Sequence, residues 1–125
     1  MGMDLVPRTK VRVVESFHAN WSGWSQLGNV LEGLGCDLSE MSGCNDGDVI
    51  SAKTCKAWAK ELAKALDEGS IKTVYTKDEF YLGGGYNKLT VSNGYTGEKD
   101  LIESDRDWLE SFVEFLYSCG GCRQC

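Results

Sequence analysis

The sequence predicts a single small α+β domain in which about three helices pack on an antiparallel sheet of three to five strands. Two segments place apolar residues at helical spacing after capping residues, and a later segment is again helical. A stretch between them is rich in β-branched and aromatic residues and is interrupted by turn signals. The expected order of elements is therefore β-α-α-β-β-β-α, which is typical of helices packed on a sheet.

The first strand and the first helix are predicted from residues 10–35. Residues 10–16 read KVRVVES, a short β-branched run that indicates a strand. Asn20 is the expected N-cap of the helix that follows, and Gly35 is expected to end it. At 100° per residue, one side of this helix collects the apolar side chains of Trp24, Leu27, Val30, Leu31 and Leu34.

The second helix is predicted to follow a loop over residues 36–49. Ser51 is the expected N-cap, the helix runs to about Asp67, and Gly69 closes it. Its apolar face consists of Cys55, Trp58, Ala59, Leu62, Ala63 and Leu66. A basic stripe beside that face consists of Lys53, Lys56, Lys60 and Lys64. We expect this stripe to be solvated, or else to meet an anionic ligand or an acidic patch.

The last third of the chain predicts strands and then a helix. Residues 71–96 indicate three or four antiparallel strands, with Asn93-Gly94 as the clearest hairpin turn. The last helix is expected to begin near Ser104 or Asp105 and to end before Gly120. Its apolar face consists of Trp108, Leu109, Phe112, Val113, Phe115 and Leu116. Three of the four tryptophans are expected to fill the core, namely Trp24, Trp58 and Trp108.

The single domain is expected over residues 10–118 of the 125-residue chain. Residues 1–9 are expected to be a flexible N-terminus or the remnant of an expression tag, because residues 5–8 spell LVPR, the recognition residues of a common tag-removal protease. Residues 119–125 are expected to form a Cys-rich C-terminal tail. No apolar run approaches the roughly 18 residues of a membrane span. Because residues 1–10 lack the apolar core of a secretory signal, we expect a cytoplasmic protein with reduced, metal-bound or redox-active cysteines.

The acidity of the chain is concentrated in one region. The formal net charge is −6, and residues 98–118 hold seven acidic residues against two basic ones. This balance argues against nucleic acid as the default partner. The residues expected to bind a partner are Asp107, Glu110 and Glu114 on one face of the last helix, together with Trp21 at the start of the first.

The leading hypothesis is a small non-enzymatic interaction module, such as an inhibitor, an immunity protein or an antitoxin-like binder. Its carboxylates would steer it onto another protein with a basic surface. A homodimer is a second arrangement to consider, with the basic stripe against the acidic helix of another copy. Solubility alone can also explain an acidic surface.

The second hypothesis is a metal-binding domain that uses the terminal cysteines. Cys119, Cys122 and Cys125 follow one another at two-residue gaps, a spacing that lets thiolates share one metal ion. Zinc is the expected cofactor, and it requires a fourth ligand, which could be Cys36, Cys44, Cys55 or His18. Three alternatives remain open: an iron–sulfur site, a redox pair, and a frayed tail in which Cys119 packs and the paired glycines end the helix.

The third hypothesis is a small enzyme. His18 is the one histidine and the one ready general base near neutral pH. A nucleophilic pair of His18 with Cys36, Cys44 or Cys55 is conceivable, although no local motif supports it. A glycine run at residues 83–85 lacks a following helix, and Asp46-Gly47-Asp48 indicates a turn rather than a cation site. An enzyme is therefore less expected than a binding protein.

Several landmarks together resemble a loose group of small uncharacterised bacterial proteins. They are the helix start N-W-x-G-W at residues 20–24, the turn N-D-G at residues 45–47 before an Ala/Leu-rich helix, and the ending F-x-x-F…G-G over residues 112–121. The resemblance covers roughly residues 17–66 and 108–121. In the group an aromatic commonly follows the paired glycines, where this chain has Cys122. The resemblance implies a grouping but no activity, and the departure argues against a metal role shared by the whole group.

Overall fold

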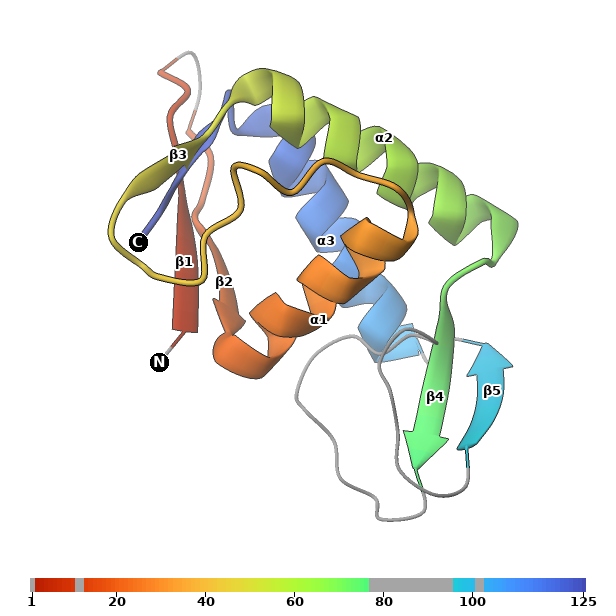
Figure 1. Ribbon diagram of the computed structural model, residues 1–125. Coiled ribbons are helices and arrows are strands. Elements are labelled where there is room, and N and C mark those ends of the chain that lie inside the picture. Colours follow the sequence, from red (N-terminus) through yellow and green to blue (C-terminus); the bar gives the residue numbers. More distant parts are fainter. Residues whose placement is uncertain (1, 11–12, 77–95, 101–102) are drawn as a thin grey trace.

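The computed structural model describes residues 2–10, 13–76, 96–100 and 103–125. It confirms the predicted fold class, because three helices pack with an antiparallel sheet of four strands (Figure 1). The elements in chain order are β1 (Gly2–Pro7), β2 (Phe17–Asn20), α1 (Trp21–Gly33), β3 (Asp48–Ile50), α2 (Ala52–Glu68), β4 (Lys72–Thr76), β5 (Thr96–Asp100), α3 (Glu103–Ser118) and β6 (Cys122–Gln124).

The four-stranded sheet has the order β2-β1-β6-β3, so strands from both ends of the chain lie at its centre. Each neighbouring pair is antiparallel, with Leu5 opposite Phe17, Val6 opposite Arg123, and Arg123 in turn opposite Val49. The β6 strand joins two segments that are far apart in sequence.

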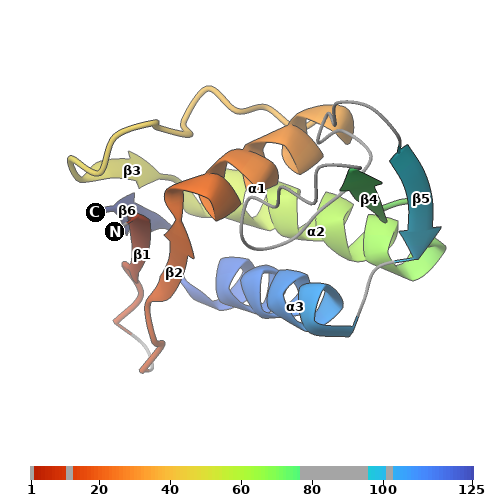
Figure 2. The same ribbon diagram turned by 90° about the horizontal axis from the view of Figure 1, so that it is seen from below.

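One face of this sheet is buried under the helices. Side chains alternate along each strand, as a half-buried sheet requires. In β1, Met3 and Leu5 are buried while Asp4 is exposed, and in β2, Phe17 is buried while His18 is exposed. Figure 2 shows the three helices on one side of these strands, which places the core between the two layers.

The two helices with predicted caps form as expected. The Asn20 side chain accepts a hydrogen bond from the Gly23 N–H, and α1 ends at Leu34. The Ser51 side chain accepts one from the Thr54 N–H, and Gly69 ends α2 in the left-handed conformation. Each cap satisfies a backbone N–H that the helix itself leaves unpaired.

The last helix, α3, packs against α2 and under the sheet. Phe17 of β2 lies with its ring 4.9 Å from that of Phe112, and its neighbours include Trp108 and Phe115. Trp24 and Trp58 are buried, and Trp108 is partly buried against the core. The prediction of a core position is therefore confirmed for Trp24 and Trp58, whereas Trp108 packs against the core without full burial.

The strand predicted at residues 10–16 lies later in the chain than the sequence pattern predicts. Residues 13–16 have no regular structure, and the strand begins at Phe17. Val13 is 96% exposed, so this part of the β-branched run lies in water. Pairing with β1 explains the shift, because the register buries Phe17 and Ala19 beside Met3 and Leu5. Tertiary packing has outweighed local β-propensity here.

Both ends of the chain differ from the expectation of a flexible start and a tail. Residues 2–7 form β1, whose Leu5 is fully buried, rather than a flexible terminus. Residues 122–124 form β6, with Cys122 and Gln124 fully buried. The physical reason is mutual: each segment is short, and each is stabilised by hydrogen bonds to the other and by its inward side chains.

The meander expected over residues 71–96 is described in part. Strands β4 and β5 form an antiparallel two-stranded sheet beyond the ends of α2 and α3. The expected turn at Asn93-Gly94 and the strands expected between residues 77 and 95 lie outside the described residues. In the part of the chain that is described, no helix is long and apolar enough to cross a membrane.

Candidate metal centre

Three cysteines from different elements meet in the core. Cys55 lies in the first turns of α2, Cys119 follows the end of α3, and Cys122 begins β6. Their sulfur atoms all lie within 4.8 Å of one another, and the three side chains are buried. We call Cys55, Cys119 and Cys122 the thiol trio. Among the described residues, no further His, Cys, Asp or Glu joins it as a ligand.

The backbone that positions the trio depends on two glycines. Gly120 and Gly121 have φ angles of +65° and +88°, so the chain turns sharply after α3 and brings Cys122 back toward the start of α2. A Cβ atom on Gly121 would lie 3.1 Å from both the Ala52 nitrogen and the Ile50 oxygen. Only glycine combines this conformation with so close an approach.

The sulfur atoms make weak contacts inside this site. The Cys55 Sγ lies 4.0 Å from the Cys122 Sγ and 3.9 Å from the Ile50 carbonyl oxygen. The Cys119 Sγ lies 3.6 Å from the Leu116 carbonyl oxygen. Thiols are weak donors and acceptors, so these contacts leave the sulfur lone pairs free for a stronger ligand.

The three thiols shift one another's pKa values. Interactions with the thiols of Cys122 and Cys55 lower the pKa of Cys119. The interaction with Cys119 raises the pKa values of Cys55 and Cys122, and burial adds to both. Because burial disfavours charged forms, deprotonation of all three thiols requires a compensating cation.

The spacing of the sulfurs suits a shared ion. Thiolates bind zinc at about 2.3 Å, and three sulfurs at that distance in a trigonal plane stand about 4.0 Å apart. The Cys55–Cys122 separation of 4.0 Å already has this value. The remaining separations are at most 4.8 Å. The three sulfurs can therefore lie around one ion, and zinc would need a fourth ligand in addition.

The trio overlaps with the predicted terminal triplet but is not identical to it. Cys119 and Cys122 come together as predicted, whereas Cys125 is exposed and Cys55 takes the third position. Alternation along the terminal strand explains the difference, because residues three apart in a strand point to opposite faces. The Cys125 backbone instead pairs with Asp4, through bonds of 2.8 and 2.9 Å.

The other cysteines and the histidine lie apart from the trio. Cys36 is half-buried, and its pKa is raised by burial and by the negative charge of Glu61. Cys44 is exposed. The His18 Nδ1 lies 2.6 Å from a carboxylate oxygen of Asp4 on the exposed face of the sheet. None of these three joins the metal-ligand group found among the described residues.

A second buried polar group, Gln124, is not predicted by the sequence pattern. Its amide nitrogen donates to the Glu40 and Asp48 carbonyls at 2.9 and 3.3 Å, and its oxygen accepts from the Ser42 N–H at 2.6 Å. Two tryptophans hold the same loop, since the Trp24 and Trp58 indole nitrogens donate to the carbonyls of Ser42 and Asp37. Strand alternation from Cys122 would have placed Gln124 inward, had β6 been predicted.

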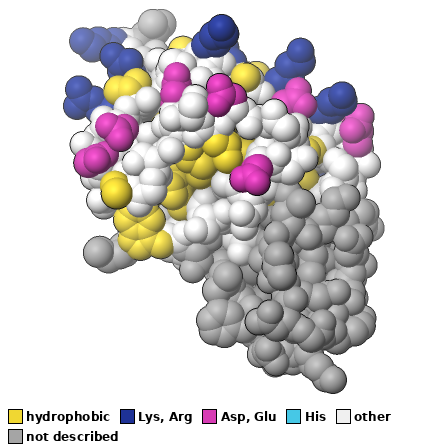
Figure 3. Space-filling model, viewed as in Figure 1, with side chains coloured by type: hydrophobic (Ala, Val, Ile, Leu, Met, Phe, Trp, Pro, Cys, Tyr) yellow, Lys and Arg dark blue, Asp and Glu magenta, His cyan; other side chains and the backbone are white. Residues whose placement is uncertain are grey.

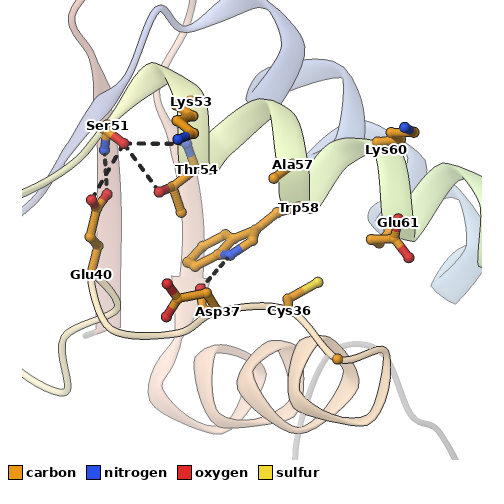
Figure 4. Close-up of a pocket in the computed structure, with 11 residues that line it drawn as sticks. Cys36, Asp37, Glu40, Ser51, Lys53, Thr54, Ala57, Trp58, Lys60 and Glu61 are labelled. Atoms are coloured by element: carbon orange, nitrogen blue, oxygen red, sulfur yellow. Dashed lines mark hydrogen bonds between the residues drawn. The ribbon is translucent and has the colours of Figure 1, made fainter.

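An open pocket of about 580 Å³ lies between this loop and α2. Figure 4 shows Trp58 reaching down from α2 toward the loop, with Asp37 and Cys36 beneath it. Glu40 accepts hydrogen bonds from the Ser51 N–H and hydroxyl, and the N–H bond is the main cause of the lowered pKa of this carboxyl. This bond fixes the loop at the helix start, which is a structural task.

The predicted partner-binding residues lie on the surface. Asp107, Glu110 and Glu114 are exposed on α3, and Trp21 is 37% exposed at the start of α1. Among the described residues none of the three acids forms an ion pair. Glu114 also lines an open pocket of about 520 Å³ together with Val14, Glu15, Phe115, Tyr117 and Ser118.

The basic stripe is exposed along α2, as expected of a solvated stripe. The members, Lys53, Lys56, Lys60 and Lys64, are all exposed. Figure 3 shows basic side chains along the upper edge of the molecule, where Figure 1 places α2, with acidic side chains below them. The two signs of charge are therefore interspersed on this face.

Comparisons with known proteins add no relative. No family model matches the chain, and neither the curated proteins nor the solved structures contain a significant match. The grouping with small bacterial proteins therefore stays a prediction, and the function has to be argued from the geometry of the site.

Proposed function

We propose that this protein binds a soft metal ion through the thiol trio. The observation that supports the proposal is the convergence of three buried sulfurs, within 4.8 Å of one another, from α2, the end of α3 and β6. Soft thiolate ligands favour ions such as zinc and monovalent copper. Binding rather than catalysis is favoured, because every sulfur is buried and no substrate can reach the ion directly.

The bound ion would connect parts of the chain that otherwise meet only by packing. Cys55 belongs to the start of α2, while Cys119 and Cys122 flank the turn that leads into the central strand β6. An ion that binds the folded state alone stabilises it by mass action. The free energy of unfolding of the protein would thus rise with the concentration of the ion.

The test is a titration of metal-free, fully reduced protein with Cd(II) and Zn(II), followed by native mass spectrometry. We expect one ion per chain, with binding abolished in Cys55→Ser, Cys119→Ser and Cys122→Ser. Cys125→Ser is the matched control, since it removes a nearby thiol that is exposed. Binding that is lost in Cys125→Ser but kept in Cys55→Ser would show instead that the terminal triplet is the site, and no binding of these or any other thiophilic ion would overturn the proposal.

We infer a second candidate function, recognition of a basic protein, from the pocket beside Glu114. Two exposed carboxylates, Glu15 and Glu114, border this pocket, and Tyr117 and Val14 supply apolar surface. A Lys or Arg side chain could lay its stem on the apolar residues and its charge between the acids. Asp107 and Glu110 would extend the same acidic face, with Trp21 as an anchor beyond it.

The second candidate is tested by affinity capture with the wild-type chain and with Glu15→Lys/Glu114→Lys. We expect the double variant to lose a captured basic partner while keeping its melting temperature. Glu32→Lys is the control, because it makes a like charge change on the exposed side of α1. A partner that binds the double variant as well as the wild type would contradict this function.

A further inference from the structure

The charge around the thiol trio limits which ion it can hold. All three sulfurs are buried. The basic residues near the trio in sequence, Lys53, Lys56 and Arg123, are exposed. Among the residues whose burial is described, no Lys, Arg or His is buried, so none of them offsets negative charge inside the site.

Three thiolates carry a charge of −3, so the charge of the complex depends on the ion. A monovalent ion leaves −2, a divalent ion leaves −1, and a trivalent ion leaves a neutral complex. A buried charge without a partner costs several kcal/mol, so the neutral complex is the one that this environment favours. The coordination number points the same way, because zinc requires a fourth ligand that the described residues do not supply.

We propose that the thiol trio takes a trivalent, thiophilic metalloid, with arsenic(III) as the representative, in preference to a divalent ion. The inference rests on the proposed function and names the ligand class of that site. Three-coordinate arsenic(III) binds three sulfurs and keeps its fourth position for a lone pair, so three buried thiols complete its coordination. The apolar surroundings of the trio then need no further ligand.

The reaction balances without an oxidant or a base. Arsenous acid, As(OH)₃, reacts with three S–H groups to form three As–S bonds, and three As–O bonds break. Each thiol proton leaves with a hydroxyl group as water, so three water molecules are released and arsenic remains trivalent. Arsenous acid is also small and uncharged, and it enters an apolar site at a lower desolvation cost than a hydrated cation.

The test uses a full-length variant in which Cys55, Cys119 and Cys122 are the only cysteines. Cys36→Ser, Cys44→Ser and Cys125→Ser remove the thiols that are half-buried or exposed. Reduced protein is mixed with sodium arsenite alone, with Zn(II) or Cd(II) alone, and with arsenite in competition with each divalent ion. We expect one arsenic per chain, a mass increase of one arsenic atom less three hydrogens, and loss of all three free thiols. Arsenite should bind at least about tenfold more tightly than Zn(II).

The outcomes separate this inference from the function on which it rests. If Cd(II) or Zn(II) binds the trio and arsenite fails to displace it, the metalloid preference is wrong and the metal function stands. If neither arsenite nor the divalent ions bind, both are wrong. Arsenite bound through only two thiols also contradicts the proposal. Because the thiol count is made on a chain with the trio intact, the result does not depend on the folding of a variant that lacks it.

Discussion

Two buried polar side chains of β6 differ sharply in how they are satisfied. Cys122 and Gln124 both point inward, two residues apart, and both are fully buried. Gln124 uses its amide for three bonds to the loop before α2, at 2.6, 2.9 and 3.3 Å. Cys122 meets the sulfur of Cys55 at 4.0 Å. A buried group whose bonding capacity is filled has a structural role, whereas weakly bonded sulfurs are free for a ligand.

The largest effect on the metal-free protein is expected from Gln124→Leu. The change removes three hydrogen bonds worth about 1 kcal/mol each and leaves the partly buried Ser42 N–H without its acceptor, so the free energy of unfolding should fall by about 3 kcal/mol. Urea denaturation measures this loss. It should be the same with and without a bound ion. Arg123→Gln, on the exposed face of the same strand, is the control and should change stability by less than about 0.5 kcal/mol.

Gly121→Ala should disturb the thiol trio, the weakly bonded buried group of this comparison. The substitution places a Cβ atom 3.1 Å from backbone atoms at a φ of +88°, and a cost of about 2 kcal/mol is expected. It should also weaken Cd(II) binding, since the turn positions Cys122. Gly35→Ala is a matched control, because Gly35 has a φ of +81° with no atom near the added carbon. Equal effects of the two variants on Cd(II) binding would argue against a positioning role for the turn.

Cys55→Ala should show most clearly that the buried thiols differ from Gln124, because its main effect should appear only when an ion is bound. Metal-free protein should lose about 1 kcal/mol of stability, because the thiol makes only weak contacts. The variant should also lose the stabilisation that an ion gives the wild type, about 2.7 kcal/mol at a hundred times the Kd. Thermal unfolding with and without Cd(II) measures both quantities. An ion-dependent gain that persists in Cys55→Ala would place the ion elsewhere.

The smallest effect on stability is expected from Glu40→Gln. Glu40 belongs to the loop held by Gln124, which donates a hydrogen bond to its backbone carbonyl. The pKa of the Glu40 carboxyl is lowered when folded, chiefly by the Ser51 N–H. The stabilisation is therefore present above the unfolded pKa and is lost as pH falls through the folded pKa. Wild type and Glu40→Gln should differ near neutral pH and converge between about pH 5 and pH 3. Denaturation midpoints at several pH values measure this, and a difference independent of pH would refute it. Glu32→Gln serves as the surface control.

Local signals in the sequence predicted the helical layer correctly. Asn20 and Ser51 are the N-caps of α1 and α2, Gly69 ends α2, and α3 ends before Gly120. These features depend on hydrogen bonds and conformations within a few residues of each other, so they can be recognised in a short window. The candidate ligands Cys119 and Cys122 could be found in the same way, since their spacing is local.

The sheet and the third thiol ligand depended on contacts that no short window contains. Strands β1 and β6 are six and three residues long, and each pairs with the other and with one further strand. Once β6 forms, alternation turns Cys125 outward and Gln124 inward, while the left-handed Gly120-Gly121 turn brings Cys122 to Cys55. The amino-acid sequence thus determined the helices, their caps and the supply of thiols. The tertiary structure decided which thiols meet, because that depends on pairing between the two ends of the chain.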